Sequence, residues 1–270
     1  MPKKMVSLLG IPYDANSSFL RGPAFAPARI RLMEKEGSAN PYSESGARIQ
    51  EGEAYLDCGD LVFQNTGDPK QAFQAIQQKI MNLLEQGGPV LSLGGDHSIT
   101  YPIIKAYRHF YPELHILQFD AHADLYDNFD DNPYSHASPF ARIMEAGLAS
   151  TLTQAGLRTI TPHLREQMDR FNIKIVEMRN WNTDFISQLR GPLYISLDID
   201  VLDPAYAPGV SHHEPGGLSV REVLQVIHQV NVPVVGADIV EYNPARDIHD
   251  QTAMVGYKFM KELIGKMKEV

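Results

Sequence analysis

The sequence lacks the features that mark a secreted or membrane protein. It has a single cysteine, Cys58, so no disulfide can form within the chain, and this usage is typical of a reducing compartment. We interpret Cys58 as a small buried residue at the end of a strand and not as a nucleophile. Long apolar runs are also missing, and the run over residues 5–10 is too short for a signal peptide or a membrane span. We therefore expect a soluble, cytoplasmic protein with no membrane partner.

Positive charge is scarce as well. The chain has 24 Lys and Arg against 33 Asp and Glu, a formal net charge of −9, and no basic stripe. Because phosphate binding needs clustered Lys and Arg, we expect no nucleic-acid partner. With 270 residues, 43% of them hydrophobic, the chain is long enough for one large core. It has no internal repeat and no long low-complexity linker, so we predict one domain over residues 1–270.

Short apolar runs alternate with segments of helical periodicity, which indicates an α/β protein whose parallel sheet is covered on both faces. The clearest helix starts at Asp68-Pro69, ends at Gly87-Gly88 and has one apolar face. Two more helices are predicted at about 219–230 and 250–268. The predicted strands are residues 5–9, 53–57, 89–93, 114–119, 152–157, 172–177, 193–199 and 233–239.

Four of these strands end in polar clusters. They are followed by Gly94-Gly95-Asp96-His97, Asp120-Ala121-His122-Ala123-Asp124, Asp198-Ile199-Asp200 and Val240-Glu241. Ligands of open α/β sheets gather beyond the carboxyl ends of the strands, so these distant segments can converge on one place. A polar turn that merely closes each strand is the plain alternative. It is weaker at residues 193–200, where alternate apolar residues indicate that the acids face buried structure and need a cation or several donors.

The residue types in these clusters are those of a metal site. His97, Asp120, His122, Asp124, Asp198 and Asp200 are too many ligands for one four-coordinate ion. They suit two divalent ions that share bridging carboxylates and lie about 3.5–4 Å apart. The oxygen-rich set favours Mn²⁺ over Zn²⁺. Such a pair lowers the pKa of a shared water and supplies hydroxide near neutral pH.

Across nearly its whole length the chain resembles the ureohydrolases, the family of arginase and agmatinase. The resemblance rests on Gly94-Gly95-Asp96-His97-Ser98, on the Asp120–Asp124 motif and on residues 196–204, Ser-Leu-Asp-Ile-Asp-Val-Leu-Asp-Pro. It implies a three-layer αβα fold with an eight-stranded parallel sheet and two Mn²⁺ per chain. By this resemblance Asp120 and Asp198 bridge the ions. His97 and Asp124 complete one site, and His122 and Asp200 complete the other.

Two further residues match the family by position. His136, in Tyr134-Ser135-His136-Ala137-Ser138-Pro139, corresponds to the proton-shuttle histidine, and Glu241 to the acid that pairs with the substrate guanidinium. A carboxylate can hold this planar cation through two parallel hydrogen bonds. The resemblance thus implies hydrolysis of a guanidino compound to urea and a primary amine, with His136 as general acid. A loop histidine and a loop-capping glutamate are the structural alternatives.

The sequence gives conflicting signals about the substrate. Residues 125–133 contain three acids and no base, a field that favours the cationic tail of agmatine over the carboxylate of arginine. Residues 135–145 instead resemble the plant arginase branch, because most agmatinases and animal-type arginases have glycine where Ala137 stands. We predict agmatine as the substrate, with L-arginine as the alternative. His212 and His213 lie in a loop expected at the mouth of the site, where either could contact substrate.

Other functions compatible with this scaffold are formimidoylglutamate hydrolysis, deacetylation with a single zinc, and a non-catalytic metal-binding partner protein. A single-zinc site does not need His97 and Asp124, and all eight site residues are present, so the enzyme with two ions is favoured. The resemblance also implies a homotrimer or homohexamer.

Overall fold

An eight-stranded, all-parallel sheet runs through the middle of the molecule in the computed structural model, which describes residues 5–37 and 39–269. Its strand order is β2-β1-β3-β8-β7-β4-β5-β6. The strands are β1 (Val6–Gly10), β2 (Tyr55–Asp60), β3 (Val90–Leu93), β4 (His115–Phe119), β5 (Thr151–Leu157), β6 (Lys174–Glu177), β7 (Leu193–Asp198) and β8 (Val234–Val240). The three-layer αβα prediction is confirmed, and each predicted strand is present with its ends shifted by at most three residues.

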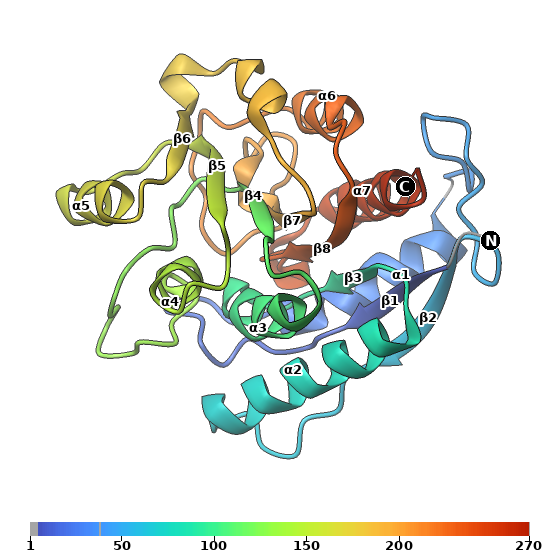
Figure 1. The fold of residues 1–270 in the computed structure, drawn as a ribbon. Coiled ribbons are helices and arrows are strands. Elements are labelled where there is room, and N and C mark those ends of the chain that lie inside the picture. The colour runs from blue at the N-terminus through green and yellow to red at the C-terminus, as the bar shows by residue number, and fades with distance from the viewer. Residues whose placement is uncertain (1–4, 38, 270) are drawn as a thin grey trace.

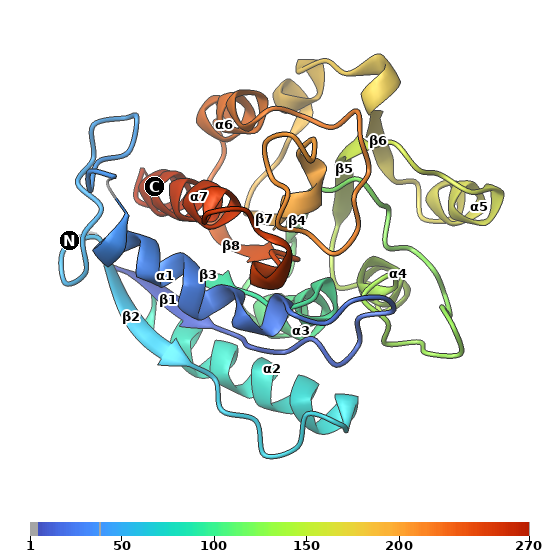
Figure 2. The same cartoon turned by 180° about the vertical axis from the view of Figure 1, so that it is seen from behind.

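Helices cover both faces of the sheet, as Figures 1 and 2 show from opposite sides. One apolar core contains the buried side of α2 (Pro69–Gln86), α3 (Thr100–Phe110), α4 (Pro139–Glu145) and α5 (Pro162–Arg170). The other contains that of α1 (Ala26–Glu36), α6 (Val220–Gln229) and α7 (Gln251–Met267). Burial on both faces explains why the central strands read as continuous apolar runs in the sequence. No helix in the described parts of the chain is both long and apolar enough to cross a membrane.

The predicted helices begin and end where their sequence signals lie. Asp68 accepts hydrogen bonds from the backbone of Lys70 and Gln71 at the start of α2, and Gly87 ends the helix with φ 78°. Ser219 and Glu222 form a reciprocal capping box at the start of α6. The edge strand β2 is less buried than the centre of the sheet, so Cys58 is half-buried and not buried as expected.

The sheet order places the four polar clusters beside one another. β3, β8, β7 and β4 are consecutive strands at the centre of the sheet, and all run in the same direction. Their carboxyl ends therefore share one edge, and the segments that follow them meet there. The convergence of these four distant segments, which the sequence predicted, is confirmed.

Candidate metal centre

The backbone after β3 is held tightly, and this fixes the position of His97. A Cβ atom on Gly95 would lie 1.8 Å from the carbonyl oxygen of Tyr13, so only glycine fits there. Asp96 caps the following 3₁₀ turn by accepting from Ser98 N, and it also accepts from Asn16 N. His97 begins this turn and is fully buried.

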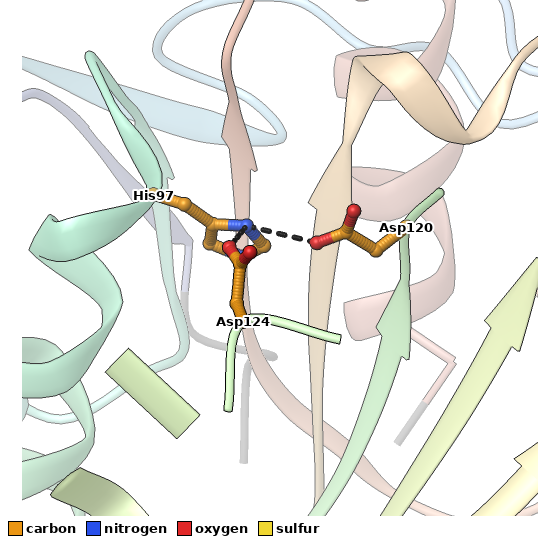
Figure 3. Close-up of side chains that lie close together, drawn as sticks. All are labelled: His97, Asp120 and Asp124. Carbon is orange, nitrogen blue, oxygen red and sulfur yellow. Dashed lines mark ion pairs between the residues drawn. The ribbon is translucent and has the colours of Figure 1, made fainter. Parts of the chain in front are cut away.

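His97, Asp120 and Asp124 form a first cluster, which we call the His97 group. Figure 3 shows the side chains of Asp120 and Asp124, which follow β4, pointing toward that of His97, which follows β3. His97 Nδ1 lies 3.1 Å from Asp120 Oδ2 and 3.1 Å from Asp124 Oδ2. Asp198 Oδ2 is 3.2 Å from the same nitrogen. The four residues that the family resemblance assigns to one ion are thus brought together.

The hydrogen bonds on the far side of the imidazole identify its tautomer. Ser196 Oγ donates to Asp238 Oδ1 at 2.7 Å and lies 2.9 Å from His97 Nε2. A hydroxyl has one proton, so Ser196 accepts from Nε2–H, and Nδ1 of the neutral ring carries a lone pair. Nδ1 is buried and forms no hydrogen bond with the described residues. Three carboxylate oxygens around this nitrogen need a positive charge, which a proton or a divalent ion can supply, so these residues fit a divalent ion.

The pKa values in the His97 group show the same demand for positive charge. Burial alone lowers the pKa of His97, but Asp120, Asp124 and Asp198 raise it well above its ordinary value. Burial and the neighbouring Asp120 raise the pKa of Asp124 to about 6. Burial, Asp200 and Asp120 raise the pKa of Asp198 well above its ordinary value. These carboxylates repel one another in a buried place, and a bound cation would remove that cost.

A second cluster, the His122 group, contains Asp120, His122 and Asp200 with ligand atoms all within 4.8 Å of one another. His122 Nδ1 lies 2.9 Å from Asp200 Oδ2 and 3.6 Å from Asp120 Oδ1. Burial lowers the pKa of His122, but Asp200 and Asp120 raise it to about 12. Asp120 therefore presents one oxygen to each group, as expected of a bridging carboxylate.

Asp198 contacts a side chain of the His97 group and the backbone of a member of the His122 group. Oδ2 faces His97, whereas Oδ1 accepts from the backbone N–H of Asp200 at 2.7 Å. All six predicted ligands therefore lie at one place, and their role as ligands remains a proposal.

His136 and Glu241 form a pair beside the His97 group. His136 Nδ1 lies 2.8 Å from Glu241 Oε1, which also accepts from His97 N at 2.8 Å. Burial lowers the pKa of His136, but Glu241 raises it to about 9. Burial raises the pKa of Glu241, but His136 brings it below its ordinary value. Among the described residues nothing donates to Glu241 Oε2, so this oxygen is available to a cationic ligand.

Two site residues have unusual backbone conformations. Asp124 has φ 51° and Glu241 has φ 63°, in the left-handed region that residues other than glycine seldom adopt. The backbone N–H of Glu241 is held by Gly95 O at 2.9 Å, which helps to keep this conformation. Such strain concentrates at functional sites, where the surrounding structure maintains it.

A pocket of about 170 Å³ opens onto these residues. Four of the six predicted ligands line it with His136 and Glu241, and the outer wall comes from loops and from Leu164 on α5. The remaining lining residues are Ser18, Ala123, Tyr126, Phe129, Ala137, Thr159, Leu164 and His212.

The loop at residues 125–133 contributes aromatic rings to the pocket, not charge. Tyr126 and Phe129 line it, whereas Asp127, Asp130 and Asp131 do not. Asp127 instead lies 3.3 Å from His163 Nε2. The acidic field that favoured agmatine is therefore not built into the wall of the pocket.

The two loop histidines differ in position. His212 lines the pocket, and its buried Nε2 has no partner among the described residues. Its ring centre lies 5.4 Å from that of His136 and 6.0 Å from that of His122. His213 is exposed, and its Nε2 lies 2.8 Å from Pro208 O. Of the two candidates, His212 is the one in position to contact a ligand.

Several residues that support the site were not found from the sequence. Ser18 Oγ lies 2.8 Å from His136 Nε2, and Ser196 and Asp238 hold His97 from behind. Ser196 lies two residues before Asp198 on the same strand. Because side chains two residues apart share a face of a strand, the sequence could have placed Ser196 on the same face as this ligand. The contact between Ser196 and Asp238 depends on the register of β7 with β8, which no local pattern reveals.

Comparisons with known proteins agree with this geometry. The model of the Arginase family matches residues 4–265. The chain is 45% identical over 282 residues to "Arginase 1, mitochondrial" of Arabidopsis thaliana, covering 99% of this chain and 82% of that protein. It is 34% identical over 270 residues to an agmatinase of Bacillus anthracis, covering 96% of this chain and 90% of that protein. The solved structure of an arginase from Medicago truncatula superposes with a TM-score of 0.92 at 41% identity, covering 97% and 87%.

Proposed function

The chain belongs to the arginase family of ureohydrolases, and we propose that it hydrolyses L-arginine to urea and L-ornithine. The observation that carries this choice is the 45% identity to a plant arginase over 99% of the chain, against 34% to an agmatinase. This difference favours L-arginine, the alternative substrate, over agmatine, which the sequence predicted. The cytoplasmic location and the trimer or hexamer stay predictions.

We propose that two Mn²⁺ ions bind at the His97 and His122 groups. The donor set of four carboxylates and two imidazoles fits this hard, divalent ion. When bound, the ions supply an activated water as the nucleophile near neutral pH. Asp120 directs one oxygen toward each group, whereas Asp198 directs Oδ2 toward His97 and accepts from the backbone N–H of Asp200 with Oδ1.

Glu241 and His136 act on the substrate itself. Glu241 Oε2 accepts from the guanidinium and orients its carbon toward the nucleophile. His136 is paired with Glu241, which raises the pKa of the imidazole to about 9, so His136 carries a proton at neutral pH. It can therefore give that proton to the leaving amine as a general acid.

One feature of the pocket favours agmatine as a second candidate. Among the described residues that line the pocket there is no Lys or Arg to pair with the carboxylate of arginine. Hydroxyl and imidazole groups are present instead, from Ser18, Tyr126, Thr159 and His212. These groups can donate to a carboxylate without a formal charge.

Urea release by the purified protein loaded with Mn²⁺ tests the proposal. We expect kcat/KM for L-arginine to exceed that for agmatine at least tenfold. A higher value for agmatine would reverse the choice of substrate, and formamide release from formimidoylglutamate would move the chain to that branch. One metal ion per chain would favour the single-zinc alternative. The Glu241→Gln variant controls for contaminating activity.

A further inference from the structure

Two buried glutamines lie behind the ligands, in the interior of the sheet. Gln118 on β4 and Gln154 on β5 are partners in the strand register, and both are fully buried. Strands in the centre of a parallel sheet are mostly apolar on both faces. A buried amide is costly unless its hydrogen bonds are made, so two facing amides need a reason.

Their hydrogen bonds form a chain that ends on a predicted ligand. Gln154 Nε2 donates to Gln118 Oε1 at 2.6 Å and to Ala123 O at 2.6 Å. Gln118 Nε2 donates to Asp120 Oδ2 at 2.7 Å and more weakly to His122 O at 3.4 Å. Gln118 and Asp120 are two residues apart and so lie on the same face of the strand.

The direction of each amide is set by its neighbours. The carboxylate of Asp120 only accepts, so Gln118 must turn its NH₂ toward it and its oxygen toward Gln154. Gln154 then faces two acceptors, Gln118 Oε1 and Ala123 O, and must present its own NH₂ to both. Its Oε1 is left buried without a partner among the described residues. The arrangement leaves Gln154 Oε1 without a hydrogen bond, and in return the two amides donate to Asp120 Oδ2 and Ala123 O.

The shorter hydrogen bonds of the amide chain lead to the His97 group, and its only contact with His122 is the 3.4 Å hydrogen bond to the backbone carbonyl. Asp120 Oδ2, which Gln118 holds, is the oxygen 3.1 Å from His97 Nδ1. Asp120 Oδ1, which faces His122, is held by the backbone N–H of His122 at 2.6 Å. Ala123, whose carbonyl Gln154 holds, immediately precedes Asp124, the third member of the His97 group.

We propose that Gln118 and Gln154 are positioning residues that set the affinity of the His97 group for its divalent cation. They do so by fixing Asp120 Oδ2 and the backbone before Asp124. The affinity of the His122 group depends on them little. This inference rests on the proposed function only in that both groups bind cations.

The test is a titration of metal-free protein with Mn²⁺, followed by calorimetry and by electron paramagnetic resonance of the ions. Gln118→Met and Gln154→Met keep the side-chain length and remove the amide. We expect each to weaken one of two binding steps by roughly 10–100-fold and to leave the other within about threefold. Gln167→Met changes a buried glutamine on α5 and is the matched control, with both steps unchanged.

Two further variants identify the affected group. Asp124→Asn disables the His97 group, and in that background Gln154→Met should not weaken the step that remains. His122→Asn disables the other group, and there Gln154→Met should still weaken binding. The double variant of Gln118 and Gln154 should lose less affinity than the product of the two single losses, because the two amides share the route through Asp120 Oδ2.

Several outcomes would overturn the inference: equal weakening of both steps, no weakening, multiplied effects in the double variant, or a wild-type protein that binds fewer than two ions. If Gln118→Met does not fold, judged by circular dichroism, Gln154→Met decides alone, because it removes the group that orients Gln118. The experiment measures metal binding, so its result does not depend on which substrate the protein hydrolyses. Site-selective weakening without urea release would keep the inference and refute the proposed function.

Discussion

Replacing Arg158 should weaken both the fold and the His122 group. This side chain follows β5 and donates to five backbone carbonyls, those of Gly156, Asp200, Val201, Leu202 and Glu214. It therefore holds together the end of one strand, the turn that carries Asp200 and the loop beyond. In Arg158→Met these carbonyls lose a charged donor whose hydrogen bonds are worth roughly 1.5–3 kcal/mol each.

We expect a smaller loss of stability than the sum over these five hydrogen bonds. Val201 O also accepts from Leu218 N at 3.0 Å, and the half-buried position lets some of the other carbonyls regain water. We expect Arg158→Met to lower the free energy of unfolding by about 3 kcal/mol. For a chain of this size that lowers the Tm by roughly 6–12 °C. The free energy of unfolding of Arg158→Lys should lie between those of the wild type and Arg158→Met, because an ammonium cannot reproduce the planar fork of donors.

Calorimetric unfolding and Mn²⁺ titration check this prediction together. The binding step assigned to the His122 group should weaken, since Arg158 holds the carbonyl of Asp200, while the His97 group keeps its affinity. Arg165→Met is the control: its ion pair with Glu177 lies at the surface, with 41% of the arginine side chain exposed, and its loss should cost about 1 kcal/mol or less. An Arg158→Met protein as stable as the wild type would refute the reasoning.

Three further variants test separate parts of the account. Glu241→Gln removes the charge facing the guanidinium and should lower kcat/KM for urea release by about 10²–10³-fold, with both ions still bound by calorimetry. His136→Asn should lower kcat by roughly 10²–10⁴-fold with little change in KM, and an unchanged kcat would remove His136 as the general acid. Hydrogen bonds from Arg221 lower the pKa of Glu44 to about 2, so the stability that Glu44 contributes is present above its ordinary pKa of 4.5 and is lost as the pH falls toward 2. Urea unfolding should therefore show Glu44→Gln less stable than wild type at pH 7, with the gap closing below about pH 4.5; a constant gap would contradict the assignment.

The sequence predicted the sheet better than the helices. Buried strands appear as apolar runs bounded by turn residues, and α2 has both caps and a clean apolar face. Four helices, α1, α3, α4 and α5, were not located. α4 has seven residues and α5 buries only three of nine, so neither shows a full helical period. α3 contains Pro102 near its start and follows directly on the His97 turn, which hides its beginning.

The clusters of candidate metal ligands could be recognised in the sequence because each cluster is local. Asp120, His122 and Asp124 are spaced two apart, and the chemistry of such a cluster is visible without a fold. The residues that hold the ligands could not be predicted in the same way. Gln118 contacts Gln154, and Ser196 contacts Asp238, only because their strands are neighbours in a particular register. Strand order and register are properties of the whole sheet, and neither is written in any one segment.

These supporting contacts divide the site into two parts with different structural origins. Gln118, Gln154, Ser196 and Asp238 all lie within strands, where a shift of one residue would turn every side chain to the opposite face. In the outer wall of the pocket, Tyr126 and residues 129, 159 and 212 lie instead in loops. Loops tolerate changes that a central strand does not. The loops that contact the substrate tail can therefore change while the sheet keeps the candidate ligands in place. For this reason the candidate ligands are recognisable in the sequence, whereas arginine and agmatine are hard to distinguish.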